Sequence, residues 1–389
     1  MRIYFDNAAS TKIDSQVLEA MMPYLTEKYG NASSLHSWGQ EAREAVEKAR
    51  AKVAELIGAR PEEIIFTGGG SEALFIAIVG VGLAQMGKRN NNFTLPIEHH
   101  AALDPFDHLT PHGFRTMSVP VDKYGIADMQ FIKRSIDKDT ALVNIMYVNN
   151  EVGTIQPIAE TAEIIKRQSK NADSTAIFHT DATAAKYEDL NVKKLGIDLM
   201  TLTPHKFYGP KGIGILYIKN GINIKSIIKG KHEKGLRAGT ENTAYIVGAT
   251  KALELLEKEK AENGKKLKKL QKKLIKGVLD KVKNSRLTGH PEKRCPDITS
   301  FLIGGVEGEA MLLRLDAEGI ACSSGSACTS GNLKPSHVLR AMGYKPEECH
   351  GSLRISLGKY NTQKELDYFL QVFPRIVNDL RQMAPKFES

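Results

Sequence analysis

A lysine in the stretch LTPHKFYGPKG, residues 202–212, has the surroundings of a chemically reactive amine. Lys206 follows the apolar residues Leu199, Met200 and Leu202, which are typical of the end of a buried strand. Strands that end in a Gly/Pro-rich loop often deliver their last side chains to a ligand crevice. A lysine in such a crevice is partly desolvated, which lowers its pKa and makes the amine nucleophilic. These residues alone leave two interpretations open, a Schiff-base lysine and an ordinary solvated loop charge.

A second candidate group is the carboxylate of Asp181, in the stretch FHTDATAA. It follows an apolar strand, where an unpaired carboxylate is costly, so it needs a cationic partner such as a protonated heterocyclic nitrogen. A helix-capping aspartate is the alternative. Asp181 and Lys206 are 25 residues apart, one β-α-β step, and both can face the same crevice. An aspartate for a pyridinium nitrogen and a lysine for an aldehyde are the two protein partners that pyridoxal phosphate requires.

A glycine turn, TGGGSE at residues 67–72, lies between a predicted strand and a predicted helix. Its backbone N–H groups and the helix N-terminus could hold a phosphate, with Ser71 as the helix N-cap. A turn that only reverses the chain explains the same residues.

The elements that must position these groups alternate between helices and strands, which predicts an α/β domain with a largely parallel sheet. A long helix over residues 37–58 ends at Gly58 and precedes the strand EEIIFT and the glycine turn. A helix SEALFIAIVGVGLAQ follows, and then the strand-like runs TALVNIMYV, TAIFHTDA, IDLMTLT and GIGILYIK.

The remainder of the chain predicts a second, smaller α+β domain. A long helical region after Gly239 leads to the strand-rich stretch RCPDITSFLIGG and to helices at GEAMLLRLDAEG and TQKELDYFLQVFPRIVNDLRQ. We therefore expect a large domain over residues 15–250, and a small domain built from residues 1–14 and 251–389.

The net charge of +9 is concentrated in one segment. Between Lys251 and Arg286 there are 13 Lys and Arg residues against 5 Asp and Glu. Leu267, Leu270 and Leu274 recur there at helical spacing, which indicates an amphipathic helix with a lysine-rich solvent face. No aromatic residues interleave with these lysines, so we expect no nucleic-acid partner.

Cysteine usage and hydropathy predict a cytoplasmic protein. Cys295, Cys322, Cys328 and Cys349 are too few and too scattered for a disulfide framework, and the spacing of Cys322 and Cys328 matches no common zinc pattern. We expect free thiols and no metal. No apolar run approaches the ~20 residues that span a bilayer, and the N-terminus lacks the apolar core of a signal peptide.

A set of motifs in order along almost the whole chain resembles the cysteine desulfurases, which take sulfur from L-cysteine for iron–sulfur clusters. The motifs are YFDNAAST, GNASSLHSWGQEAR, VNNEVGTIQPI, HTDA, HKFYGPKG, GLRAGTEN, CSSGSACTSGNLKPSHVLRAMG and HGSLRISLGKYNT. The resemblance implies a fold-type I pyridoxal-phosphate enzyme of the class V aminotransferase superfamily. Its large domain is expected to hold a mostly parallel seven-stranded sheet.

The resemblance also assigns the cofactor site. Lys206 matches the lysine that forms the Schiff base, and Asp181 matches the partner of the pyridine nitrogen. His99 matches the histidine that stacks on the ring and assists proton transfer. The alternative for His99 is one member of a surface histidine pair. Asn150 matches the asparagine near the ring hydroxyl. The implied phosphate ligands are Gly70, Ser71, Thr203, His205 and, from the partner subunit of a homodimer, Thr240.

For the substrate, the resemblance points to a thiol and a guanidinium. Cys328, in SSGSACTSG, matches the nucleophile that becomes a persulfide, and its small neighbours suit a loop that moves between substrate and acceptor. Arg354, in SLRIS, matches the clamp for the substrate carboxylate, a task suited to a bidentate guanidinium. A structural ion pair is the alternative for Arg354.

Three places depart from the family pattern. Ala184 stands where a glutamine usually touches the cofactor hydroxyl, GGGSEALF replaces GATESNN, and Lys229, Lys231 and His232 occupy a usually glycine-rich stretch. The expected function is a homodimeric cysteine desulfurase that yields L-alanine and passes sulfur to an iron–sulfur scaffold protein. The alternatives are a related pyridoxal-phosphate lyase or aminotransferase, including a selenocysteine lyase, and a non-catalytic dimer that scaffolds cluster assembly.

Overall fold

The computed structural model describes residues 2–172, 176–325 and 334–383 and contains a central seven-stranded sheet. The strand order is β2-β8-β7-β6-β5-β3-β4. The strands are β2 (Ile64–Thr67), β3 (Asn91–Thr94), β4 (Arg115–Ser118), β5 (Thr140–Asn144), β6 (Ile177–Asp181), β7 (Leu199–Leu202) and β8 (Gly214–Ile218). Within this sheet β8 runs antiparallel to both of its neighbours, and the other pairs are parallel. The predicted mostly parallel sheet is therefore confirmed.

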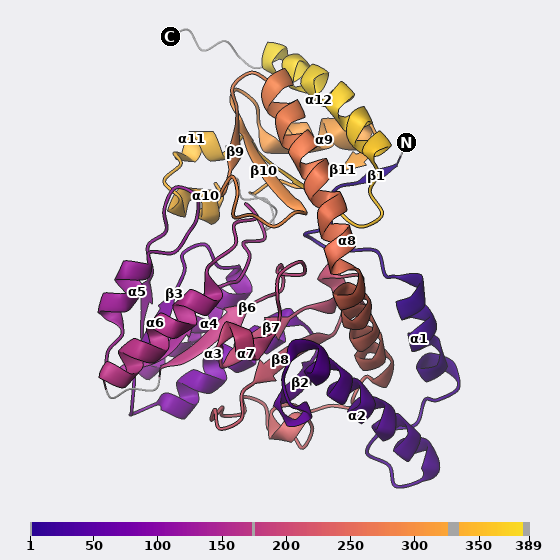
Figure 1. Cartoon of the computed structure of the whole chain (residues 1–389), viewed down its shortest axis with the longest axis vertical. Helices are drawn as coiled ribbons and strands as arrows, with labels where there is room; N and C mark the ends of the chain where they lie inside the picture. Colours follow the sequence, from indigo (N-terminus) through magenta and orange to yellow (C-terminus); the bar gives the residue numbers. More distant parts are fainter. Residues whose placement is uncertain (1, 173–175, 326–333, 384–389) are drawn as a thin grey trace.

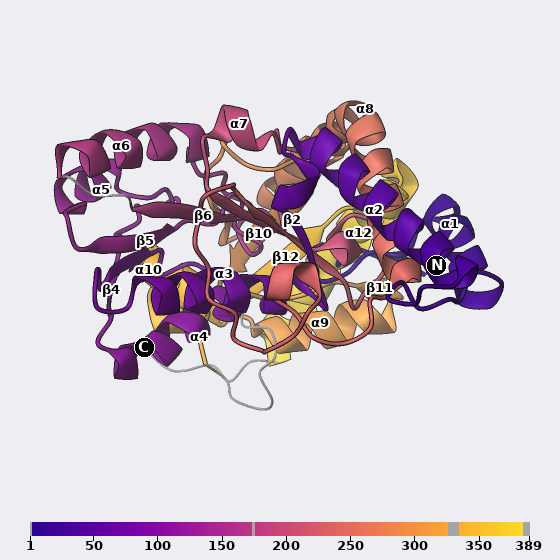
Figure 2. The same ribbon diagram turned by 90° about the horizontal axis from the view of Figure 1, so that it is seen from below.

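Helices cover both faces of this sheet, which explains why its central strands are buried throughout, without alternation between buried and exposed residues. Every residue of β5 and of β6 is buried. Figure 2 shows the sheet between α3 and α4 on one side and α6 and α7 on the other. The helices of this part are α1 (Ser15–Thr26), α2 (Ser37–Ile57), α3 (Gly70–Gln85), α4 (His100–Leu109), α5 (Met129–Ser135), α6 (Ile158–Asn171) and α7 (Val192–Leu195), with short 3-10 turns at η1 (Pro61–Glu63), η2 (Thr110–His112), η3 (Pro204–Lys206) and η4 (Glu233–Gly235).

Local signals predicted one helix end correctly and one helix start to within a residue. α2 ends at Gly58, whose φ of +72° lies in the left-handed region that favours glycine. The helix predicted from Ser71 begins one residue earlier, at Gly70.

A second group of elements forms the upper part of the molecule in Figure 1. β9 (Ser285–Thr288), β10 (Ile298–Ile303) and β12 (Ser352–Ser356) make an antiparallel sheet, and β1 (Ile3–Tyr4) pairs with β11 (Ile320–Ala321). The accompanying helices are α9 (Gly308–Ala317), α10 (His337–Ala341), α11 (Pro346–Cys349) and α12 (Gln363–Met383). The N-terminal strand thus joins the C-terminal half of the chain.

One long helix, α8 (Thr243–Lys281), runs through both parts. Its first half packs on α1 and α2, and its second half buries Leu267, Leu270 and Leu274 in the upper core. The predicted amphipathic helix is confirmed. Because α8 passes residue 250 without a break, the division of the chain into domains at that position stays a prediction.

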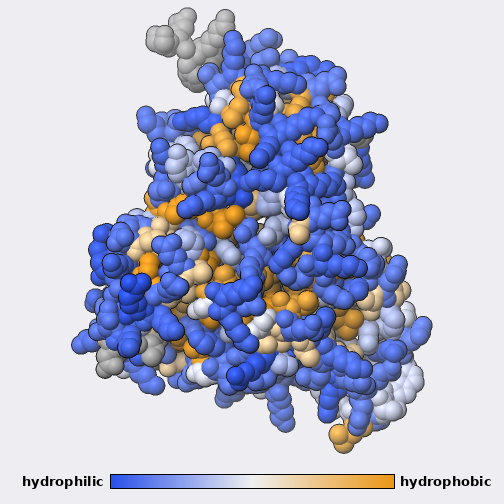
Figure 3. Space-filling model, viewed as in Figure 1, coloured by the Kyte–Doolittle hydropathy of each residue, from blue (hydrophilic) through white to orange (hydrophobic). Residues whose placement is uncertain are grey.

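The visible face of the molecule is mostly hydrophilic, with hydrophobic side chains showing where the upper and lower parts meet (Figure 3). No helix in the described ranges is long and apolar enough to cross a membrane.

Candidate active site

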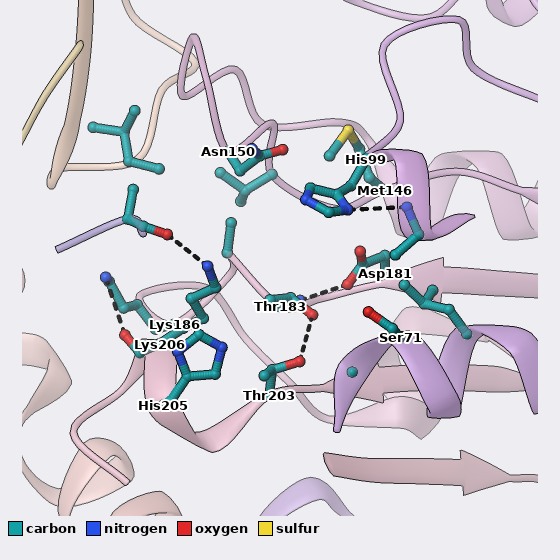
Figure 4. Close-up of a pocket in the computed structure, with 17 residues that line it drawn as sticks. Ser71, His99, Met146, Asn150, Asp181, Thr183, Lys186, Thr203, His205 and Lys206 are labelled. Carbon is teal, nitrogen blue, oxygen red and sulfur yellow. Dashed lines mark hydrogen bonds between the residues drawn. The ribbon is translucent and has the colours of Figure 1, made fainter. Parts of the chain in front are cut away.

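A cavity opens at the carboxyl ends of β6 and β7, close to the junction with the upper part (Figure 4). Parallel strands place ligand crevices at this edge of a sheet. The residues that line it are Ala8, Gly70, Ser71, Leu74, His99, Ala101, Met146, Val148, Asn150, Asp181, Thr183, Ala184, Lys186, Thr203, His205, Lys206 and Ile298.

Lys206 reaches this cavity from η3, the tight turn that follows β7. The N-terminal segment holds this turn, because Thr11 donates from its backbone N–H to the carbonyl of His205 at 2.9 Å. The Thr11 hydroxyl also accepts from the backbone N–H of Tyr208 at 2.7 Å. Tyr208 has a φ of +67°, which is unfavourable for a residue with a side chain. The surrounding bonds therefore maintain a strained turn directly after the lysine.

The amine of Lys206 lies in a setting that favours its neutral form. Its Nζ donates to the carbonyl oxygens of Ala8 and Ala9, each at 2.8 Å. Burial lowers the pKa of Lys206 to about 8, and the positive charges of Arg354 and Lys186 act in the same direction. An amine with this pKa is partly unprotonated near neutral pH, as a Schiff-base lysine requires. The solvated-charge alternative for Lys206 is not supported.

The carboxylate of Asp181, the last residue of β6, lies in the wall of the same cavity. Its Oδ1 accepts from the backbone N–H of Thr183 at 2.9 Å, and it caps no helix. The neighbouring Glu98 is fully buried, and both burial and the charge of Asp181 raise its pKa well above the usual range. These influences favour the neutral form of Glu98, and Asp181 is the carboxylate that lines the cavity and can face a cationic ligand.

His99 presents its ring to the cavity from the N-terminus of α4. Its Nδ1 accepts from the backbone N–H of Ala101 at 3.1 Å, which assigns the ring proton to Nε2 in the neutral form. Burial among protein atoms lowers the pKa of His99, while Asp181 opposes the change. The lowered pKa keeps the ring neutral, and its Nε2–H is the donor that is not used by the backbone of α4.

The start of α3 and the end of β7 form the opposite wall. A Cβ added at Gly70 would lie 2.2 Å from the Thr203 hydroxyl oxygen, so a hydrogen is needed at that position. The Thr203 hydroxyl is 3.0 Å from that of Thr183. The expected N-cap role of Ser71 is wrong, because Gly69 is the N-cap and makes no side-chain capping bond. The Ser71 hydroxyl remains exposed within the first turn, where helix N–H groups attract an anion.

Arg354 approaches from β12 of the upper sheet. Its Nη2 pairs with Asp6 at 3.0 Å, and its Nη1 donates to the carbonyl of Asn150 at 3.1 Å. The ion pair foreseen as the alternative for Arg354 is therefore present. The buried Nε has no hydrogen-bond partner among the described residues, and one donor remains available.

The structure brings most of the predicted site residues together. Lys206, Asp181, His99, Gly70, Ser71, Asn150, Thr203 and His205 all line the cavity. Thr240 is exposed and is not among the described lining residues. Cys328 lies outside the described residues. Of the departures from the family pattern, Ala184 lines the cavity, whereas Lys229, Lys231 and His232 do not.

Sequence reasoning missed Lys186, Glu98 and Asp6, which surround the predicted residues. Lys186 follows two alanines in the loop after Asp181, an apolar setting that is unusual for a solvated lysine. That signal was available in the sequence. Asp6 gave no such signal, because its contact with Arg354 joins positions 348 residues apart.

Comparison with known proteins decides the family. Residues 3–369 match the aminotransferase class-V family. The chain belongs to this family. It is 43% identical to cysteine desulfurase IscS 1 of Archaeoglobus fulgidus, over 99% of both chains. It is 44% identical to cysteine desulfurase IscS of Clostridium botulinum, over 100% of this chain and 97% of the other. The structure of a NifS-like protein superposes with a TM-score of 0.91 at 38% identity, over 98% of this chain and 100% of the other.

Within the class-V family this chain is a pyridoxal-phosphate-dependent cysteine desulfurase of fold type I. Its own residues fit the cofactor. The desolvated amine of Lys206 matches the cofactor's aldehyde, and the carboxylate of Asp181 in the cavity wall matches its pyridine nitrogen. Gly70 lacks a Cβ and so leaves room for the phosphate beside the Thr203 hydroxyl and the N-terminus of α3.

Proposed function

We propose that this cysteine desulfurase takes the sulfur of L-cysteine onto Cys328 as a persulfide and passes it to a protein that assembles iron–sulfur clusters. We further propose that it works as a homodimer in the cytoplasm. The observation that carries the proposal is the position of Lys206 and Asp181 in one cavity, with the amine held largely desolvated.

In this proposal Lys206, Asp181 and His99 hold the reactive part of pyridoxal phosphate, and Asn150 lies near its ring hydroxyl. Gly70, Ser71, Thr203 and His205 hold the phosphate, and Thr240 of a second subunit completes that site. When bound, the cofactor supplies an electron-withdrawing ring that stabilises negative charge on the substrate carbon skeleton. Burial and the neighbouring lysines lower the pKa of His205 to about 4, so it acts as a neutral hydrogen-bonding group.

Protein groups supply the remaining steps. Arg354 binds the substrate carboxylate, and the Lys206 amine takes the proton from Cα. The thiolate of Cys328 attacks the substrate sulfur, and the Cβ–S bond breaks. Its electron pair stays on Cβ, which is then protonated, and Lys206 returns a proton to Cα to give L-alanine. The transferred sulfur is formally oxidised while the carbon is reduced, so no external oxidant is needed.

The other cysteines support the choice of Cys328 as nucleophile. Burial raises the pKa of Cys322 to about 12 and that of Cys349 to about 11, and it raises the pKa of Cys295 well above the usual range. These three thiols are protonated at neutral pH, and thiols attack much more slowly than thiolates.

Exposed apolar side chains support a dimer. Tyr29 and Trp38 lie with ring centroids 5.1 Å apart, and Leu35 precedes Trp38 closely in the chain. The exposed fractions of Tyr29, Trp38 and Leu35 are 68%, 50% and 85%. Leu25, at the end of α1, is 51% exposed. Such apolar groups near one another on a surface indicate a protein interface. Sedimentation of the wild-type protein and of Trp38→Glu tests this: we expect a dimer that dissociates in the variant, and a monomeric wild type would contradict it.

The deciding experiment for the activity measures alanine and sulfide formed from L-cysteine with a reducing agent present. We expect one alanine per sulfide in the wild type and loss of both products in Lys206→Ala. We expect Cys328→Ala to lose turnover and Cys322→Ala, the matched cysteine control, to retain it. Wild-type turnover in Cys328→Ala would contradict the proposed nucleophile. Reduction of the holoenzyme and peptide mass mapping should place the cofactor on Lys206.

A further inference from the structure

A second lysine, Lys186, lies beside Lys206 in the cavity wall (Figure 4). It belongs to the loop between β6 and α7, and its side chain is only 2% exposed. Lysine is rarely buried to this degree unless its charge is paired.

The partner of Lys186 is Asp297, from the upper part of the molecule. Its Oδ2 lies 2.7 Å from Nζ of Lys186, and its side chain is 0% exposed. Asp297 immediately precedes β10 and is followed by Ile298, another lining residue of the cavity. The ion pair therefore connects the two parts of the molecule at the floor of the active site.

Stability alone does not account for this buried pair, because buried ion pairs often stabilise a fold no better than apolar residues of the same volume. Its position points to a role in the cavity. The Nζ of Lys186 also donates to the backbone carbonyl of Lys206 at 3.3 Å, and so holds the turn that carries the reactive amine.

Lys186 also adds a fixed charge to the surroundings of that amine. Burial alone would lower the pKa of Lys186, but Asp297, together with Tyr208 and Cys295, outweighs burial and raises the pKa above the usual value, so Lys186 stays charged. Several charged and titratable groups act on the Lys206 amine from the surrounding elements. Arg354 and Lys186 disfavour its protonation, and Asp181 and Asp6 favour it. The charge of Lys206 in turn lowers the pKa of His99.

We propose that Lys186, held by Asp297, is a positioning residue for Lys206 that fixes its turn and keeps a permanent cation beside its amine. The inference rests on the proposed role of Lys206 and extends it. The cation favours the neutral amine, which is the form that attacks an aldehyde and accepts a proton from substrate. The hydrogen bond to the carbonyl keeps that amine directed into the cavity.

The first test uses the apoprotein and needs no turnover. The pH dependence of amine labelling at Lys206, followed by peptide mass mapping, should give a midpoint near the pKa of about 8 in the wild type. In Lys186→Met/Asp297→Asn, which removes both charges together, the midpoint should rise by about 0.5 to 1 pH unit. That shift corresponds to about a three- to tenfold smaller neutral fraction near pH 7. Lys186→Arg, the matched control that keeps the cation, should leave the midpoint close to the wild-type value.

A second variant guards against misfolding of the first. In Lys186→Met the cation is removed while Asp297 remains, so the Lys206 midpoint should again rise. An unchanged or lower midpoint in whichever of these variants keeps the wild-type unfolding temperature would overturn the proposal.

The holoenzyme provides the second test. In the double variant Lys186→Met/Asp297→Asn we expect kcat to fall about tenfold, KM for L-cysteine to stay nearly unchanged, and the pH profile of kcat to shift to higher pH. In Lys186→Arg we expect values near those of the wild type. A wild-type kcat and an unshifted pH profile of kcat in this double variant would reject the positioning role of Lys186. Failure of the proposed function has a different signature, because the wild type itself would then form no alanine.

Discussion

Gly70→Ala tests the phosphate site with one added methyl group. The Cβ of alanine would lie 2.2 Å from the Thr203 hydroxyl oxygen, well inside van der Waals contact, so the hydroxyl must move or the helix start must shift. Either movement disturbs the 3.0 Å contact between the hydroxyls of Thr203 and Thr183. It also narrows the space where the helix N–H groups would meet a phosphate.

The magnitude follows from the contacts at stake. Losing one hydrogen bond to a charged group costs about 1.5–3 kcal/mol. At 1.4 kcal/mol per tenfold change, the Kd for pyridoxal phosphate should rise about 10- to 100-fold. Stability should change little, because alanine gains about 1 kcal/mol of helix propensity over glycine, which offsets the disturbed hydroxyl contact.

The assay is a titration of apoprotein with pyridoxal phosphate, read by visible absorbance, alongside thermal unfolding of the apoprotein. Gly69→Ala is the control, since a Cβ at Gly69 meets nothing within 4 Å. Thr203→Ala and the double variant Gly70→Ala/Thr203→Ala complete a cycle, in which the two losses should be less than additive. An affinity in Gly70→Ala within twofold of wild type would refute the assignment of the phosphate to this wall.

Three further predictions concern the charged groups of the site. Asp181→Asn should retain cofactor on Lys206 but lower kcat at least about 100-fold, because the anion that pairs with the pyridine nitrogen is gone; rates within tenfold of wild type would contradict this role. Arg354→Lys should raise KM for L-cysteine about tenfold or more, since lysine cannot form the bidentate contact, while cofactor affinity measured by titration stays unchanged. Glu98→Gln should remove part of the pH dependence of stability. The folded state raises the pKa of Glu98 above its ordinary value of 4.5, so the folded chain binds its proton more tightly and wild-type stability falls as pH rises above about 4.5. In denaturant titrations across pH this component should be absent from Glu98→Gln, and an identical pH dependence would show that Glu98 is not protonated.

Much of the fold was predictable because its signals are local. The apolar runs that became β5, β6 and β7, the glycine that ends α2 and the leucine spacing of α8 each depend on residues within one or two turns of the chain. Boundaries were less certain, as the start of α3 at Gly70 shows, because a helix start depends on backbone geometry at a glycine that tolerates several conformations.

The sequence by itself determined the chemistry of this protein: a lysine and an aspartate one β-α-β step apart, a glycine turn before a helix, and motifs that place the chain among the cysteine desulfurases. Only the tertiary structure decided the protonation of the Lys206 amine. Arg354 acts on this amine and Lys186 donates to the carbonyl of its turn only after folding, which also pairs Lys186 with Asp297 from the upper part of the molecule. A pKa depends on desolvation and on charges within a few ångströms, and neither quantity is fixed until the two parts of the molecule are packed together.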